Sequence, residues 1–186
     1  MTHKEIHKAI VSSQCGEQWA YRSLFSEFNG MVWRMVRQMV DNDMEAEELT
    51  QDVFVKAFGA LASFDENKAH FATWLGRIAY NTVINHLKTH RTPTLSLTNC
   101  DIEDDSEDTA YDTDQTPNLL EERINELTHQ MQEMPGEDRT LLTMYYFERL
   151  PLKDIAYMMQ TKPEILANRL ARIRKRLYKR LKEKGL

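Results

Sequence analysis

The sequence is poor in the residues that mark several classes of protein. It holds two cysteines, Cys15 and Cys100, in 186 residues. A disulfide framework needs more than this, so we expect a protein of the reducing cytoplasm. No stretch approaches the roughly 18 apolar residues of a membrane-spanning helix, and no apolar signal peptide opens the chain. Glycine (6) and proline (5) are also rare, whereas helix-forming residues are frequent, which indicates an all-α fold.

Charge is distributed unevenly beneath a net charge of −5. Residues 1–91 are nearly neutral, 92–118 hold eight acidic residues and no basic ones, and 119–148 hold seven acidic residues against two basic. The last segment, 149–186, carries 12 basic and 3 acidic residues. A basic helical segment is the electrostatic pattern of a phosphate binder, although a solvated charged helix has the same composition.

Apolar residues at helical spacing predict a three-helix bundle over residues 1–91. One apolar stripe runs from Ala20 to Met39, a second from Leu49 to Leu61, and a third from Phe71 to Leu87. The segment 41–43 breaks the first pattern and offers N-cap oxygens to the second helix. These three helices are expected to form one domain.

A second helical domain is expected over 119–186, joined to the first by a flexible acidic linker over 92–118. Its last part has the form of a helix-turn-helix, with a short helix over 152–159, a three-residue turn, and Pro163 in the first turn of a second helix. Along that helix Asn168, Arg172 and Lys175 lie beside an apolar stripe. Arginine can bond guanine and asparagine can bond adenine in a major groove. A coiled-coil helix with solvated charges is the alternative.

Five segments together resemble the extracytoplasmic-function (ECF) sigma factors, a branch of the sigma-70 family of bacterial RNA polymerase. Residues 45–61, EAEELTQDVFVKAFGAL, are similar to the family's DAEDLTQEVFLRAWRAL, and 71–82, FATWLGRIAYNT, to FxTWLYRIARN. The other three are PGEDRTLL (135–142), YFERLPLKDIA (146–156) and NRLARIRKRL (168–177). The resemblance covers both expected domains in order and leaves the linker unmatched.

The resemblance implies a sigma factor that binds core RNA polymerase and directs promoter-specific initiation. It would read the −35 and −10 elements of promoter DNA and assist melting at −10. Docking on the clamp of the β′ subunit would use Gln51, Asp52, Phe54, Val55 and Lys56. Contacts to the −10 element would come from Trp74, Arg77, Asn81, Asn85, Lys88 and Arg91. Contacts to the −35 element would come from Lys153, Ala167, Asn168, Arg169, Ala171, Arg172 and Lys175.

Three of these residues have a structural alternative, and one expected role is more specific. Phe54 and Trp74 also suit a hydrophobic core. Arg77 also suits an ion pair within the protein. Asn81 corresponds to the family position that lines a pocket for one flipped base, which is the way an unpaired strand is captured.

The turn of the helix-turn-helix departs from the family pattern. Gln160 stands where the family has glycine. We therefore expect Gln160 either to adopt a left-handed conformation, at a cost of about 1 kcal/mol, or to reshape the turn.

No pattern in the sequence indicates catalysis. There is no glycine-rich phosphate loop and no nucleophile elbow, and the pair His3 and His7 lacks further metal ligands nearby. We expect no enzymatic activity, no metal, no cofactor and no small-molecule ligand. The resemblance implies one further partner, an anti-sigma factor, which in the family is commonly membrane-bound.

Two other functions fit the same residues. The chain could be a helix-turn-helix regulator whose first domain senses a ligand or dimerises, which predicts tight binding to a two-fold operator without polymerase. It could instead be a helical interaction protein, which predicts no salt-dependent affinity for DNA.

Overall fold

The computed structural model describes residues 1–90 and 117–184, with side chains placed for 1–89 and 122–184. Every regular element within these residues is helical, which confirms the all-α prediction. In order the elements are α1 (His3–Gln14), α2 (Gln18–Arg37), α3 (Asp43–Gly59), the short 3₁₀ turn η1 (Leu61–Ser63), α4 (Phe71–His90), α5 (Pro117–Gln132), α6 (Gly136–Leu142), the π-helical turn η2 (Thr143–Phe147), α7 (Leu152–Met158) and α8 (Pro163–Glu183). The expected linker over 92–118 lies outside the described residues except for its last two, which begin α5.

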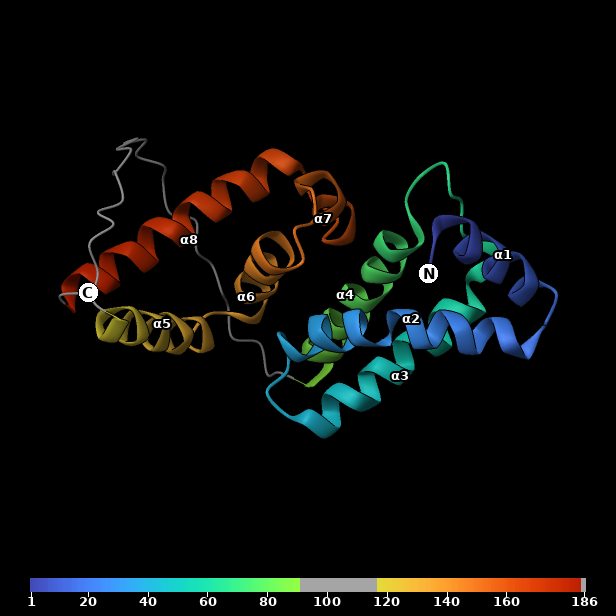
Figure 1. Ribbon diagram of the computed structural model, residues 1–186, viewed down its shortest axis with the longest axis horizontal. Coiled ribbons are helices and arrows are strands. Elements are labelled where there is room, and N and C mark those ends of the chain that lie inside the picture. Colours follow the sequence, from blue (N-terminus) through green and yellow to red (C-terminus); the bar gives the residue numbers. More distant parts are fainter. Residues whose placement is uncertain (91–116, 185–186) are drawn as a thin grey trace.

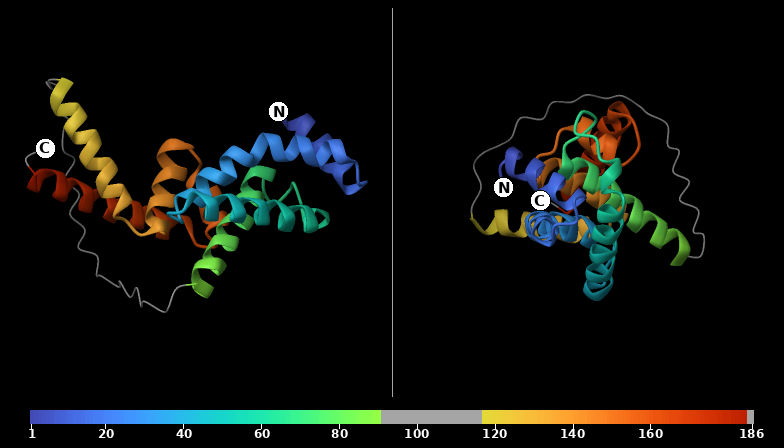
Figure 2. Two further views of the ribbon diagram at one scale, coloured as in Figure 1. Left: turned by 90° about the horizontal axis from the view of Figure 1, so that it is seen from below. Right: turned by 90° about the vertical axis from the view of Figure 1, so that its right-hand side faces the viewer.

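The N-terminal helices form a bundle in which α2 contacts α1, α3 and α4 (Figures 1 and 2). The sequence predicted α2, α3 and α4 but not α1. Helix α1 begins at a capping box, in which Thr2 accepts from the backbone of Glu5 and the Glu5 carboxylate accepts from Thr2. It buries only Ala9, Ile10 and Ser13, so its apolar stripe is too short to be recognised from spacing alone.

Helix α3 begins where the sequence predicted. The side chain of Asn42 accepts hydrogen bonds from the backbone nitrogens of Met44 at 2.9 Å and Glu45 at 3.2 Å. These bonds satisfy two of the amide groups that a helix start leaves unpaired. Asp43 and Glu45 place negative charge in the first turn, where the helix dipole favours it.

The C-terminal helices pack around α8, which contacts α5, α6 and α7 (Figure 1). The predicted stripe of α8 is buried at Leu166, Leu170, Ile173 and Leu177. Ile155 and Ala156 of α7 are buried, as is Met159 directly after it, as expected from the sequence.

The two groups of helices are in contact, because α7 packs against α4. In Figure 1, α7 lies beside α4 at the centre of the molecule. Buried side chains from both groups, including Leu75 of α4 and Met158 of α7, belong to one hydrophobic cluster. The described helices therefore form two groups, as the sequence predicted, and these groups are in contact with each other.

Candidate protein and nucleic-acid interfaces

The outer face of α3 carries the residues predicted to contact polymerase. Gln51, Asp52 and Lys56 are exposed, and Val55 is 71 % exposed. A single exposed apolar side chain is normal on a protein surface, so these exposures show that the residues are accessible to a partner. Four of the five predicted residues thus share one accessible face.

Phe54 lies on the opposite side of α3, inside the bundle. It is 3 % exposed, and its ring lies 4.7 Å from that of Phe25 and 5.7 Å from that of Phe58, between ring centroids. In this structure Phe54 is a core residue that holds α3 against α2.

Side chains in the first half of α4 pack against other parts of the protein. Trp74 is 9 % exposed, and its ring centroid lies 5.4 Å from that of Phe64 and 5.6 Å from that of Phe71. Arg77, one turn later, places its guanidinium carbon 5.0 Å from the ring centroid of Tyr157 in α7. This cation–π geometry joins α4 to the helix-turn-helix.

The second half of α4 presents amides and a cation. Asn81 is half-buried, whereas Asn85 and Lys88 are exposed, and their spacing places all three on neighbouring turns of one helix face. Arg91, the last residue predicted for the −10 contact, lies outside the described residues. Next to this face, His86 pairs with Glu45 at 2.6 Å between Nε2 and Oε1.

Tyr80 lies on α4 where the C-terminal helices approach it. The pKa of its hydroxyl is raised to about 12, chiefly by burial and also by the negative charge of Glu137, while Arg169 acts in the opposite direction. Glu137 and Arg169 belong to α6 and α8. The raised pKa of Tyr80 therefore depends in part on the contact between the two groups of helices.

The turn between α7 and α8 has the conformation anticipated for it. Gln160 adopts φ +53°, in the left-handed region. Pro163 then begins α8 at a position where its missing N–H leaves no bond unmade. The helix-turn-helix geometry is therefore reached without the glycine.

One face of α8 presents the residues predicted to read DNA. Ala167, Asn168, Ala171, Arg172 and Lys175 are all exposed, and Lys153 is exposed on α7. Within the described part of the chain, Arg172, Lys175 and Lys153 form no ion pair. Their donors are available to phosphate oxygens and base edges.

Arg169 behaves differently from its neighbours on α8. Its Nε donates to Asp138 Oδ1 at 2.6 Å, and its Nη1 and Nη2 each donate to Glu137 Oε2 at 3.1 Å. Burial alone would lower the pKa of Arg169, but the two carboxylates outweigh it and the pKa is raised. The group predicted to contact phosphate is engaged inside the protein.

Other cations of α8, and Lys184 directly after it, also contact polar side chains of the segment before the helix-turn-helix. Arg176 donates to Asp138 at 3.0 Å, and Lys184 lies 2.7 Å from Glu126. Arg180 donates to Gln130 and lies 3.6 Å from Glu133. Sequence reasoning missed these pairs, although the acidic excess of 119–148 next to a basic 149–186 was the available signal.

His3 and His7, the pair considered as metal ligands, contact different side chains. His7 Nδ1 lies 2.9 Å from Glu66 Oε2, and the ring of His3 lies edge-on to that of His70 at 6.1 Å between centroids. Among the described residues, no three His, Cys, Asp or Glu side chains are arranged to hold a metal ion. Across the same residues, no helix combines the length and apolar character needed to cross a membrane.

Comparisons with known proteins match both groups of helices. The family models of Sigma-70 region 2 and Sigma-70, region 4 match residues 24–92 and 124–177. The RNA polymerase sigma-H factor of Pseudomonas aeruginosa is 32 % identical over 97 % of this chain and 96 % of its own length. The ECF RNA polymerase sigma factor SigW of Bacillus subtilis is 25 % identical over 96 % of this chain and 97 % of its own.

Two solved structures share the fold. CnrH in complex with the cytosolic domain of CnrY aligns with a TM-score of 0.64 at 18 % identity, over 96 % of this chain and 98 % of CnrH. The sigma factor RpoE in complex with the anti-sigma factor NepR from Bartonella quintana aligns with a TM-score of 0.60 at 17 % identity, over 87 % of this chain and 96 % of RpoE. The chain belongs to the extracytoplasmic-function branch of the sigma-70 family, the regulatory proteins that direct promoter-specific initiation of transcription by RNA polymerase.

Proposed function

We propose that the exposed face of α3 is the surface by which this sigma factor docks on core RNA polymerase, at the clamp of the β′ subunit. Gln51, Asp52 and Lys56 supply polar contacts around the apolar side chain of Val55. Phe54 supports that surface from inside the bundle and contributes through packing.

The −10 element is assigned to α4 within a domain that spans residues 1–91. Asn81, Asn85 and Lys88 offer amide and ammonium groups along one side of the helix, and Arg91 extends the series in sequence. Asn81 is proposed to hold one base flipped out of the duplex, and Lys88 to contact the strand's phosphates. Trp74 is buried beneath this side of α4 and supports it through packing. Arg77 can contact DNA only after its guanidinium group moves away from the ring of Tyr157.

The −35 element is assigned to α8, within a domain that spans residues 119–186. The supporting observation is the division of its charged residues between two faces. Arg169 and Arg176 bind acidic side chains of α6, whereas Asn168, Arg172 and Lys175 face solvent. Lys153 adds a phosphate contact from α7, and the methyl groups of Ala167 and Ala171 offer apolar contact to thymine. Arg169 acts by fixing the orientation of α8.

The chain is proposed to act in the cytoplasm and to carry out no chemistry itself, since RNA polymerase forms the phosphodiester bonds. An anti-sigma factor is proposed as a further partner. The fold that this chain shares with RpoE of Bartonella quintana, which was solved with the anti-sigma factor NepR, supports that proposal.

The test is transcription in vitro on a pool of genomic fragments, with core RNA polymerase and this protein. Discrete start sites that appear only when the protein is added support the proposal and give both promoter elements directly. No added start sites, together with tight binding of the protein alone to a two-fold DNA site, would support a stand-alone regulator instead.

A further inference from the structure

Arg149 ends the helical segment before the helix-turn-helix in an unusual backbone conformation. Its φ is +53°, in the left-handed region where residues with a side chain are disfavoured. Two backbone bonds close the chain around it: the nitrogen of Glu148 donates to the carbonyl of Thr143 at 3.0 Å, and that of Leu150 to the carbonyl of Met144 at 3.0 Å. Helices that end in this way usually place glycine at the left-handed position, so arginine here has a steric cost.

The side chain of Arg149 does not compensate for this cost within the described part of the chain. It is exposed, and among the described residues its guanidinium group forms neither an ion pair nor a hydrogen bond. An arginine near the end of a helix can donate to the last carbonyl oxygens, but the bonds that close this helix end come from backbone nitrogens. The charge of Arg149 is therefore available to a ligand.

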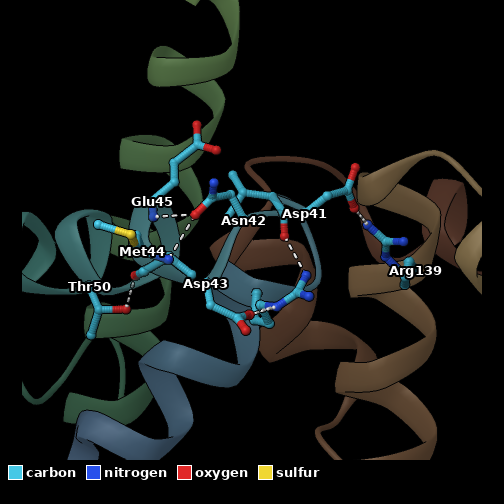
Figure 3. Close-up of polar contacts among 10 residues, drawn as sticks. Asp41, Asn42, Asp43, Met44, Glu45, Thr50 and Arg139 are labelled. Atoms are coloured by element: carbon cyan, nitrogen blue, oxygen red, sulfur yellow. Dashed lines mark hydrogen bonds and ion pairs between the residues drawn. The ribbon is translucent and has the colours of Figure 1, made fainter.

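Lys162 is a second cation at a position where local structure favours another residue. It is the N-cap of α8, and its side chain makes no capping bond. Serine, threonine, asparagine and aspartate are preferred there, and the helix dipole disfavours a cation. Helix α3 has the preferred arrangement, since Asn42 accepts from the backbone nitrogens of Met44 and Glu45, as Figure 3 shows. Lys162 is exposed and, like Arg149, forms no ion pair with any residue that the structure describes.

Arg149 and Lys162 flank α7, the first helix of the helix-turn-helix, which packs against α8 (Figure 1). Lys153, the phosphate contact already proposed, lies in the first turn of α7. Between residues 149 and 162 the sequence holds these three cations and one carboxylate, Asp154. When a helix-turn-helix binds DNA, its first helix crosses the sugar–phosphate backbone and the N-terminal end of its second helix enters the major groove. Cations that flank α7 are thereby placed beside the phosphates.

We propose that Arg149 and Lys162 contact phosphates of the −35 element, one from each side of α7, and that the chain keeps both cations at locally unfavourable positions for this contact. The proposal rests on the proposed function, which assigns α8 to −35 DNA. Residues that break a local structural rule often belong to functional sites. Gln160 provides a contrast, because it also has φ +53° but carries no charge.

The first test measures the affinity of core RNA polymerase with this protein for a promoter duplex at several salt concentrations. The duplex carries the two elements found by transcription on the genomic pool. Loss of one phosphate contact reduces the slope of log affinity against log salt by about 0.9, which is about fivefold in affinity at 0.15 M salt. Arg149→Gly and Lys162→Ser should each show this loss, and Arg149→Lys should keep the parent's slope.

Thermal unfolding of the same variants should change in the opposite direction. Glycine adopts φ +53° without steric cost, and serine caps a helix. Arg149→Gly and Lys162→Ser should therefore each raise the melting temperature by about 2–4 °C while they weaken DNA binding. A purely structural role of these residues predicts instead that stability and affinity fall together.

Two controls separate the effect of charge from the effect of backbone strain. Gln160→Gly relieves the same backbone conformation without removing a charge, so it should raise the melting temperature and leave the salt slope unchanged. Lys182→Gln removes an exposed cation that forms no ion pair among the described residues. Lys182 lies about 30 Å along α8 from Lys162, so its loss should also leave the slope unchanged.

An unchanged salt slope in Arg149→Gly or in Lys162→Ser would overturn the assignment of that residue. A loss of affinity that varies with the base sequence at −35 would overturn it as well, since a phosphate contact weakens binding to all sequences alike. Arg172→Ala tests the assignment of α8 itself, because it should change the −35 preference. An unchanged preference in Arg172→Ala is a failure of the proposed function, whereas a changed preference with unchanged slopes in the two cation variants is a failure of the phosphate contacts alone.

Discussion

Asp138 and Arg169 form a hydrogen-bonded ion pair of 2.6 Å between Oδ1 and Nε, which joins α6 to α8, the second helix of the helix-turn-helix. The other oxygen of Asp138 accepts from Arg176, two helical turns after Arg169. The Asp138 side chain is 11 % exposed, so water competes little for these bonds. One carboxylate therefore sets the angle at which α8 presents Asn168 and Arg172.

Asp138→Asn should destabilise the C-terminal helices by about 2–3 kcal/mol, because two charge-assisted bonds lose their anionic acceptor. Urea unfolding followed by circular dichroism measures this loss. Glu164→Gln is the matched control, since Glu164 is exposed and forms no ion pair among the described residues. Equal stability of the two variants would contradict a central role for Asp138.

Gln160→Gly should stabilise the protein by about 1 kcal/mol, because glycine adopts φ +53° without a steric cost. Thermal unfolding reads the change. Arg174→Gly, in the middle of α8, should instead destabilise the protein by about 1 kcal/mol, because glycine is a poor helix former. If Gln160→Gly is destabilising as well, the left-handed turn carries no strain.

Arg172→Ala should reduce discrimination at the −35 element by about 1–3 kcal/mol per contacted base pair. Run-off transcription on promoters with single −35 substitutions measures it. Arg169→Ala is the informative comparison: it should lower stability and shift the whole −35 preference, since it releases α8 from Glu137 and Asp138. An unchanged promoter choice in Arg172→Ala would remove that residue from the recognition surface.

Asp52→Lys should abolish co-purification with core RNA polymerase without unfolding the bundle, because Asp52 is exposed on the outer face of α3. Glu122→Lys makes the same charge change at an exposed position of α5 and should leave assembly intact. A folded Asp52→Lys protein that still elutes with polymerase would mean that docking uses a different surface.

The ionisation of Tyr80 should make stability fall at high pH. Its folded pKa of about 12 exceeds the ordinary value of 10, so the unfolded chain loses this proton first. The contribution is fully present below pH 10 and is lost as the pH rises towards 12, to a total of about 2–3 kcal/mol. Unfolding at pH 9 and 11.5 should differ less for Tyr80→Phe than for Tyr178→Phe, whose ring is 54 % exposed.

Local patterns predicted most of the fold. The cap at Asn42 was predicted from its residue type ahead of an apolar helical pattern, and the structure confirms it. At Gln160 the structure shows the left-handed conformation, one of the two alternatives that the sequence left open. Helix α1 was missed because it buries too few apolar side chains to make a visible stripe. The partners of Arg169 could not be predicted from local patterns. They depend on which face of α8 packs against α6, and Arg169 and Asp138 are 31 positions apart in the sequence.

The pairing of α8 with the acidic helices before it also defines which part of this protein can be exchanged in a chimera. A transplanted α7–α8 unit would leave Arg169, Arg176 and Arg180 without Glu137, Asp138 and Glu133. Arginines without these carboxylates would be repelled by a new basic neighbour or would bind phosphates indiscriminately. The smallest unit that can be exchanged with these ion pairs intact is therefore the whole of α5 to α8.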